Sequence, residues 1–293
     1  MITRIPKEQH DNDTQLYRYL SIPALFMLLQ KKSVFIPSIN LLAQNDPFEG
    51  VPASTYRELG ATLNAQEYAS ISEWLGDNAE DSEKKWLEDS SSQAHTLATL
   101  YVKQLCVRRA AWCWFRANIE SSLMWATYGH KGAAIVSSTH QLRESLPRNI
   151  NFQIADVQYV DTRGGSSRQF NPRSKENAEY KLRPHLLKRI EYQDEQELRV
   201  VCECRPGERG AIVTGIRPGK LISKVILSPL LPESEAESLK CQIEKFGREK
   251  FKVEKSRLIK DDFLFGMRTI LNKLSDAQYQ VDRKTIPISF RRI

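Results

Sequence analysis

The sequence lacks the features of an exported or membrane-embedded protein. Residues 1–15 contain no apolar core of the kind that signal peptides have, and no run of about 18 apolar residues occurs in the chain. The cysteines are few, scattered and odd in number, and none forms a C-x-x-C pair. These absences predict a cytoplasmic protein with reduced thiols and no membrane partner.

The common signatures of catalysis and nucleotide binding are also missing. The chain has no G-x-G-x-x-G, no G-x-x-x-x-G-K-[ST], no G-x-S-x-G, no H-E-x-x-H and no kinase signature. Its histidines do not cluster, and Cys202 and Cys204 would need further ligands to bind an ion, so we expect no metal site. Dinucleotide-fold and P-loop proteins are therefore disfavoured.

The composition is that of an ordinary globular protein with a basic balance. The chain has 293 residues, 41% of them hydrophobic and 27% charged, and a formal net charge of +7. This length suits one large domain or two small ones. The net charge suits an anionic ligand or a polyanion, although the basic residues are interspersed as on an ordinary protein surface.

Hydrophobic periodicity predicts strands and helices in irregular order. The predicted strands are residues 16–20, 33–38, 111–115, 132–138, 152–160, 198–203, 211–215, 222–229 and 252–259. The predicted helices are residues 22–32, 121–129, 139–146, 175–190 and 233–247, with residues 40–50 as a loop. We expect an α+β fold with a mixed, mainly antiparallel split sheet and flanking helices.

The predicted domain organisation is simple. Residues 1–259 form one α+β domain that carries a helical insertion at about residues 60–110. Residues 260–293 form a C-terminal extension, which contains an apolar, helix-like stretch and is a candidate element for oligomerisation.

Two early segments carry candidate ligand-binding residues. Arg18 lies between Tyr17 and Tyr19 in a short predicted strand, and an arginine in such a place binds a phosphate or carboxylate or simply faces water. Asp46 and Glu49 belong to the stretch "NDPFE", whose residue types favour a turn. Structural roles are the preferred interpretation of that loop.

Two later segments complete the set. Trp125 and Tyr128 share a helix face before a glycine turn, and such a pair either clamps a flat ring or belongs to the core. Glu195, Glu197 and Arg199 alternate at a predicted strand start, so their side chains share one face. Adjacent carboxylates raise each other's proton affinity and a nearby cation lowers it, as at many reactive sites and at many solvated strand ends.

Read in order, these segments resemble a known bacterial family. "LYRYL", "NDPFE", "MWATYG", "DVQYVD" and the E-x-E-x-R stretch after a lysine resemble the family catalogued as domain of unknown function 2971, over residues 16–259. The name of that family carries no activity.

A looser resemblance suggests chemistry. ADP-ribosyltransferase-like domains have an early Arg or His, a central aromatic or serine segment, and a late E-x-E. This resemblance implies NAD as substrate, Glu197 as the main carboxylate and Glu195 as its assistant. It also implies a cofactor-binding set made of Arg18, Tyr19, Trp125, Tyr128 and Ser137. Arg199 is structural in this reading, and the family's serine-threonine-serine strand is only approximated by "IVSST".

The resemblance predicts an ADP-ribosyltransferase or NAD-glycohydrolase that acts as a toxin or phage-defence effector. Its macromolecular acceptor, a protein or a nucleic acid, stays unnamed. One alternative is a nucleic-acid-binding protein or metal-dependent nuclease that uses Asp156, Glu195 and Glu197 with Lys188 nearby. Another is a non-catalytic binding or regulatory module. Convergence of Arg18, Tyr128 and the two glutamates on one cleft would favour catalysis.

Overall fold

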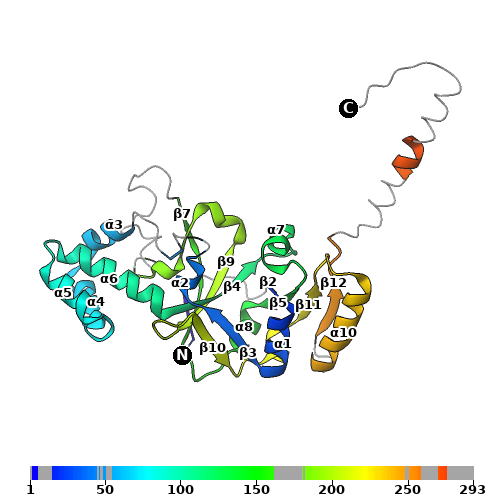
Figure 1. Cartoon of the computed structure of the whole chain (residues 1–293), viewed down its shortest axis with the longest axis horizontal. Helices are drawn as coiled ribbons and strands as arrows, with labels where there is room; N and C mark the ends of the chain where they lie inside the picture. Colours follow the sequence, from blue (N-terminus) through cyan, green and yellow to red (C-terminus); the bar gives the residue numbers. More distant parts are fainter. Residues whose placement is uncertain are drawn as a thin grey trace, which may run out of the picture.

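The computed structural model describes residues 2–5, 15–44, 46, 49–50, 55–161, 180, 182–247, 251–258 and 270–275. An eight-stranded sheet runs through the molecule in the order β1-β6-β9-β4-β2-β5-β11-β12, with helices packed around it (Figure 1). The strands of this sheet are β1 (Ile2–Ile5), β2 (Gln15–Leu20), β4 (Arg109–Arg116), β5 (Ala133–Ser138), β6 (Phe152–Asp156), β9 (Glu197–Glu203), β11 (Lys224–Leu227) and β12 (Lys252–Lys255).

Two further sheets have two strands each. One pairs β3 (Ser33–Pro37) with β10 (Gly210–Thr214), and the other pairs β7 (Gln158–Val160) with β8 (Leu187–Arg189). Within the large sheet, β1 and β6 are parallel, as are β11 and β12, and all other neighbours are antiparallel. The prediction of a mixed, mainly antiparallel sheet with flanking helices is therefore confirmed.

The large sheet has a weak seam between β2 and β4. These two fully described strands pair at two positions, Leu16 with Arg116 and Tyr17 with Phe115. By contrast, β2 pairs with β5 along all of Gln15–Leu20, and β4 pairs with β9 from Arg109 to Phe115. The sheet thus consists of two halves that part beyond Tyr17, and the candidate site lies where they part.

The two faces of the sheet are covered differently. Helix α1 (Ile22–Lys31), capped by Ser21, packs Leu25 and Leu28 into the main apolar core on one face. Other helices that accompany the sheet include α2 (Ile39–Leu42), α7 (Ser122–Met124), α8 (Thr139–Ser145), α9 (Pro218–Leu221) and α10 (Glu233–Gly247).

The other face carries a charged stretch between two apolar clusters. Glu197 and Arg199 alternate along β9 and so share this face. Register places Glu197 beside Phe115 of one cluster, and the next residue on the face after Arg199 is Val201 of the other. This part of the sheet therefore buries charge where apolar residues would be expected.

A helical insertion projects from one end of the sheet (Figure 1). It consists of α3 (Thr55–Thr62), α4 (Ala65–Asn78), α5 (Asp81–Asp89) and α6 (Gln93–Arg108). The acidic α5 is anchored through Glu83, which is buried and accepts hydrogen bonds from Lys103 at 2.6 Å and Gln104 at 2.8 Å.

Three local predictions were wrong. Within residues 182–190 the predicted basic helix is replaced by a 3-10 turn at Pro184–Leu186 and by β8, because Pro184 breaks helical hydrogen bonding and the next residues pair with β7. The single strand predicted over 152–160 is two strands, β6 and β7, which join different sheets. The predicted loop over 40–50 begins as α2, capped by the Ser38 side chain.

The C-terminal extension lies mostly outside the described residues. Its described part, residues 270–275, is helical, and Ile270, Leu271 and Leu274 are exposed. None of the helices in the described ranges combines the length and the apolarity needed to span a bilayer.

Candidate functional site

A cavity of about 240 Å³ opens at the seam between β2 and β4. Three consecutive residues of β2, Tyr17, Arg18 and Tyr19, line it together with residues 113–115 of β4. Consecutive strand residues point to opposite faces of a sheet, so both sets can line one cavity only because the two strands have parted. The cavity is therefore built by the split in the sheet.

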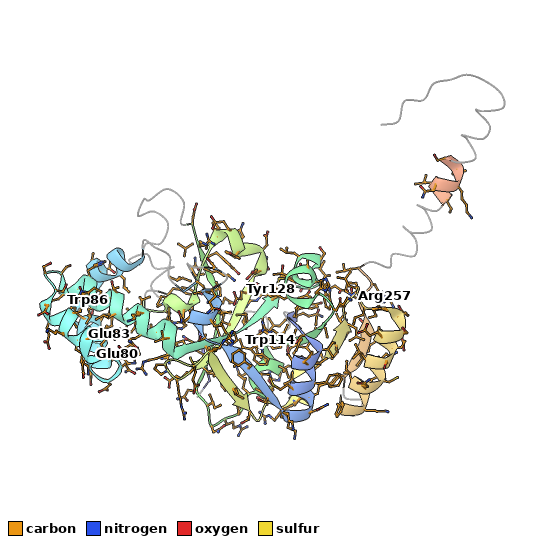
Figure 2. All side chains as sticks on the ribbon, in the orientation of Figure 1. Glu80, Glu83, Trp86, Trp114, Tyr128 and Arg257 are labelled. Atoms are coloured by element: carbon orange, nitrogen blue, oxygen red, sulfur yellow. The ribbon has the colours of Figure 1, made fainter. Side chains whose placement is uncertain are left out.

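The carboxylates predicted from the sequence line this same cavity. Its wall includes Glu195 and Glu197, and also Tyr128 from the turn after α7. Arg18, Tyr128 and the two glutamates thus converge, which is the arrangement that favours catalysis over a non-catalytic module. Figure 2 places Tyr128 above the middle of the sheet, near α7.

Gln196, which separates the two glutamates in the chain, has a left-handed backbone conformation that brings their side chains together. Glu195 ends the 3-10 helix η3 (Ile190–Glu195), Gln196 has φ 38° and ψ 54°, and β9 begins at Glu197. Glu195 therefore lies outside the strand, contrary to the alternation inferred from the sequence. The Glu197 backbone N–H donates to the Tyr159 hydroxyl at 2.8 Å, which fixes the strand's first residue against β7.

Arg199 is completely buried and binds Glu197 side-on. Its Nε donates to Glu197 Oε1 at 2.8 Å and its Nη2 to Glu197 Oε2 at 3.1 Å. It also donates to Glu49 and, at 2.6 Å, to the His185 carbonyl. Burial alone would raise the pKa of Glu197, but Arg199 and Lys188 outweigh it and hold that pKa well below its usual range. Glu197 is consequently an ionised carboxylate.

Lys188, from β8, joins three carboxylates. Its Nζ donates to Glu195 and, at 3.1 Å, to Glu197, and it lies 3.7 Å from Glu49 Oε2. Burial lowers the pKa of Lys188, but the charges of Glu197 and Glu49 raise it by more. The pKa of Lys188 therefore lies above its usual value. The sequence interpretation placed Lys188 only in the nuclease alternative.

Glu49 enters the site from the "NDPFE" loop, although the sequence favoured a purely structural role there. The loop is held by an ion pair of 2.8 Å between Asp46 and Arg189. Burial raises the pKa of the Glu49 carboxyl, with Arg199 and Lys188 opposing and Glu197 adding to the rise. The three most specific marks of the family resemblance, "NDPFE", "MWATYG" and E-x-E-x-R, therefore contribute to one cavity.

Tyr128 connects the turn after α7 to the carboxylates. Residues Trp125–Gly129 form a π-helix, a rare wide turn that is frequent at functional sites. The Tyr128 hydroxyl donates to Glu195 Oε1 at 2.9 Å. Burial and the nearby Glu195 raise the pKa of Tyr128, so the phenol stays protonated and donates.

Arg18 lines both this cavity and a second one. Its Nη1 donates to the Cys113 carbonyl at 2.7 Å, while its Nε is buried without a hydrogen-bond partner. A second cavity of about 280 Å³ under α1 shares Arg18, Tyr19 and Pro37 with the first. Its other lining residues are Leu20, Ser21, Ala24, Met27, Leu28, Val34, Phe35 and Trp112.

Two residues of the proposed cofactor-binding set lie elsewhere. Trp125 packs edge-on against Tyr19, with ring centroids 4.9 Å apart, and donates its Nε1–H to Glu120. Ser137 is buried and donates to the Leu221 carbonyl at 2.6 Å. Neither is among the residues that line the first or the second cavity. Trp125 therefore contacts the site indirectly, by packing against Tyr19, which lines the cavity.

The nuclease alternative required Asp156 beside the glutamates. Asp156 instead forms an ion pair with Arg116 and is not among the lining residues of the cavity. In the described ranges, no three His, Cys, Asp or Glu side chains group as they would around a metal ion. The cavity carboxylates are bound by Lys188 and Arg199.

Comparisons of the chain with family models, with curated proteins and with solved structures found no match.

Proposed function

We propose that the protein is an NAD-using ADP-ribosyltransferase or NAD-glycohydrolase. The observation that carries this proposal is that Arg18 lines two neighbouring cavities, one of which is also lined by the carboxylates. NAD has a cationic nicotinamide ring at one end and an anionic pyrophosphate in its middle. A site with carboxylates at one end and an arginine in the middle matches that order of charges.

The first cavity suits the reacting end of the dinucleotide. Tyr128 and the rings of the β2 residues Tyr17 and Tyr19 offer aromatic surface to the pyridinium ring. Arg18, with its unpartnered Nε, would bind the pyrophosphate. The apolar second cavity, lined by Phe35 and Trp112, then receives the other half of the molecule. Each cavity alone is smaller than a pocket for a whole drug-sized ligand.

The chemistry breaks the bond between ribose C1′ and the nicotinamide nitrogen. Nicotinamide leaves with the bonding electron pair, and positive charge develops on the ribose. Glu197, held ionised by Arg199, stabilises that charge as it develops. Glu195 orients the nucleophile, either water or an acceptor group, which attacks C1′ and gives up its proton to the Glu195 carboxylate, from which the proton passes to solvent.

The family resemblance supplies the biological setting of the proposal. A bacterial enzyme that consumes NAD or labels a macromolecule suits a toxin or phage-defence effector. The acceptor is a protein or a nucleic acid, or water if the enzyme is a glycohydrolase. The charge-rich, buried site gives no support to the nuclease alternative, because Asp156 is paired away from it.

The test measures nicotinamide release from NAD by the purified protein, alone and with bacterial lysate as a source of acceptors. Glu197→Gln and Glu195→Gln should each abolish the release. The matched control is Glu203→Gln, at the far end of the same strand, whose side chain is 80% exposed. Intact NAD in every mixture that contains folded wild-type protein would overturn the proposal, as would full activity in both site variants.

A further inference from the structure

Three carboxylates of the site share the two cations that form ion pairs with them. Glu49, Glu195 and Glu197 meet two ammonium or guanidinium groups, those of Lys188 and Arg199. Arg199 contacts Glu49 and Glu197 and leaves Glu195 aside. Within the described residues, Lys188 is the cation in ion-pair contact with Glu195. Lys188 is thus the group that bridges Glu195 to the buried pair.

The bridge is short and shielded from water. One Nζ contacts both Glu195 and Glu197, so the two carboxylates lie side by side with a single ammonium between them. The Lys188 side chain is 8% exposed and those of Glu195 and Glu197 are 14% and 4% exposed. Two carboxylates that contact the same ammonium are close enough to repel each other strongly in a poorly solvated site. Without the ammonium, one of the two carboxylates would therefore take up a proton.

We infer that Lys188 is a positioning residue, whose ammonium keeps Glu195 and Glu197 together as two ionised carboxylates. The inference rests on the proposed function for its catalytic meaning, but the charge balance holds whatever the ligand is. Lys188 would not touch the reacting atoms. It acts through Glu195, which the Tyr128 hydroxyl holds from the other side at 2.9 Å.

The groups around Lys188 come from six elements. The charged and titratable side chains that face it or its partners are Glu49 from the loop after α2, Cys113 from β4, Tyr128 from the π-helix, Tyr159 from β7, Tyr192 and Glu195 from η3, and Glu197 and Arg199 from β9. Burial raises the pKa of Cys113, Tyr128 and Tyr159 above their ordinary values. These three groups therefore stay neutral over the pH range of the experiment.

The experiment compares Lys188→Met with Lys188→Arg by urea unfolding between about pH 8 and about pH 5. Lys188→Met should lower the unfolding midpoint at about pH 8, and the loss should shrink by at least half towards about pH 5. The sign follows because the folded variant binds one proton more than the folded wild type in this range, so its stability relative to the wild type rises as pH falls. Lys188→Arg keeps the cation and should follow the wild-type pH dependence.

Two further variants serve as controls for this interpretation. Lys84→Met removes an exposed lysine on α5 and should leave the pH dependence unchanged. The double variant Lys188→Met/Glu195→Gln also removes the negative charge of Glu195, which the ammonium of Lys188 offsets in the wild type. It should be more stable at about pH 8 than Lys188→Met alone. A pH-independent loss in Lys188→Met, or a double variant no more stable than the single one, would overturn the inference. The same comparison decides the case if Lys188→Met fails to fold.

The pH dependence of NAD consumption provides a second, independent test. In Lys188→Met the acid limb of the NAD consumption profile should move up by about one pH unit, while Lys188→Arg retains the wild-type limb. An unmoved acid limb in an active Lys188→Met would count against the inference. If the wild-type protein leaves NAD intact, the proposed function fails, and the unfolding experiments still decide the role of Lys188.

Discussion

Tyr128 and Glu195, 67 residues apart in the chain, are joined by a 2.9 Å hydrogen bond from the phenol to the carboxylate. Tyr128 lies on a π-helix and is 48% exposed, whereas the Glu195 side chain is 14% exposed. The bond therefore links the surface of the molecule to its buried charge network. It also defines a part of the site that can be altered without disturbing the core.

The first prediction concerns that hydrogen bond. Tyr128→Phe should lower NAD consumption by about tenfold or more, because Glu195 loses the hydrogen bond that holds it in position to orient the nucleophile. The free energy of unfolding should change by less than about 1 kcal/mol, since the ring stays and the hydroxyl lies near solvent. Nicotinamide release and chemical denaturation would measure the two effects.

The control for Tyr128→Phe is a second half-exposed aromatic. Trp86, 50% exposed, lies on the helical insertion well away from Tyr128 (Figure 2). Trp86→Phe should leave nicotinamide release unchanged. Equal activities of Tyr128→Phe and the wild-type protein would contradict a role for the phenol in holding Glu195.

The second prediction compares the two carboxylates that share Arg199. Glu197→Gln should lower the free energy of unfolding at neutral pH by about 3–5 kcal/mol, because it leaves buried cations without their partner. Glu49→Gln should cost less than half as much. The reason is that burial raises the pKa of Glu49, whereas Arg199 and Lys188 lower that of Glu197, so a neutral amide suits position 49 better. Denaturant titrations of both variants would check the order, and a larger loss in Glu49→Gln would refute it.

Much of the fold follows from local sequence. The strands over residues 16–20, 111–115 and 132–138 were predicted because apolar, β-branched and aromatic residues cluster there between turn signals. At the helix predicted over 121–129, the Ser121 side chain caps the start by accepting from the Met124 N–H. Its widening into a π-helix was not predicted, because no periodic pattern marks one.

The site was only partly predictable, because its contacts are non-local. Arg199 and Glu49 are 150 residues apart, and the "NDPFE" stretch shows only the residue types of a turn. Lys188 was predicted to lie on a helix, and only the nuclease alternative placed it near Glu195 and Glu197. The positive φ at Gln196 carries no signal in a single sequence, since glutamine is not a residue that marks such a conformation. Strand order, which assembles these pieces, is not written in any one segment.

The third prediction concerns acid stability. His185 is buried, its Nδ1 has no hydrogen-bond partner, and burial lowers its pKa to about 3 from an ordinary value of about 6.5. A depressed pKa stabilises the fold above the unfolded value, and this stability is lost as pH falls from about 6.5 towards 3. Wild-type stability should therefore fall between about pH 6.5 and pH 5, before most carboxylates titrate.

His185→Gln removes that titration. The variant should have a shallower loss of unfolding free energy over the same interval, with a difference in slope of up to about 1.4 kcal/mol per pH unit. The two proteins share every other titrating group, including Glu49, so the difference isolates the histidine. Parallel curves for the variant and the wild type would show that His185 is protonated in the folded protein or stays uncharged in both states.

The last prediction concerns the glycine that follows the π-helix. A Cβ at Gly132 would lie 2.2 Å from the Leu20 carbonyl oxygen, at the end of the strand that carries Arg18. Gly132→Ala must therefore push β2 and the Tyr128 turn apart, at a cost of about 1–3 kcal/mol in unfolding free energy. Nicotinamide release should fall with it, because Tyr128 and Arg18 would no longer face the same cavity. Gly76→Ala is the matched control, since nothing lies within 4 Å of a Cβ there, on the exposed side of α4. That variant should gain about 0.5–1 kcal/mol, as alanine does over glycine inside a helix, and keep full activity. Equal stability of the two variants would mean that β2 and the turn can separate without cost, and that their contact does not hold the site together.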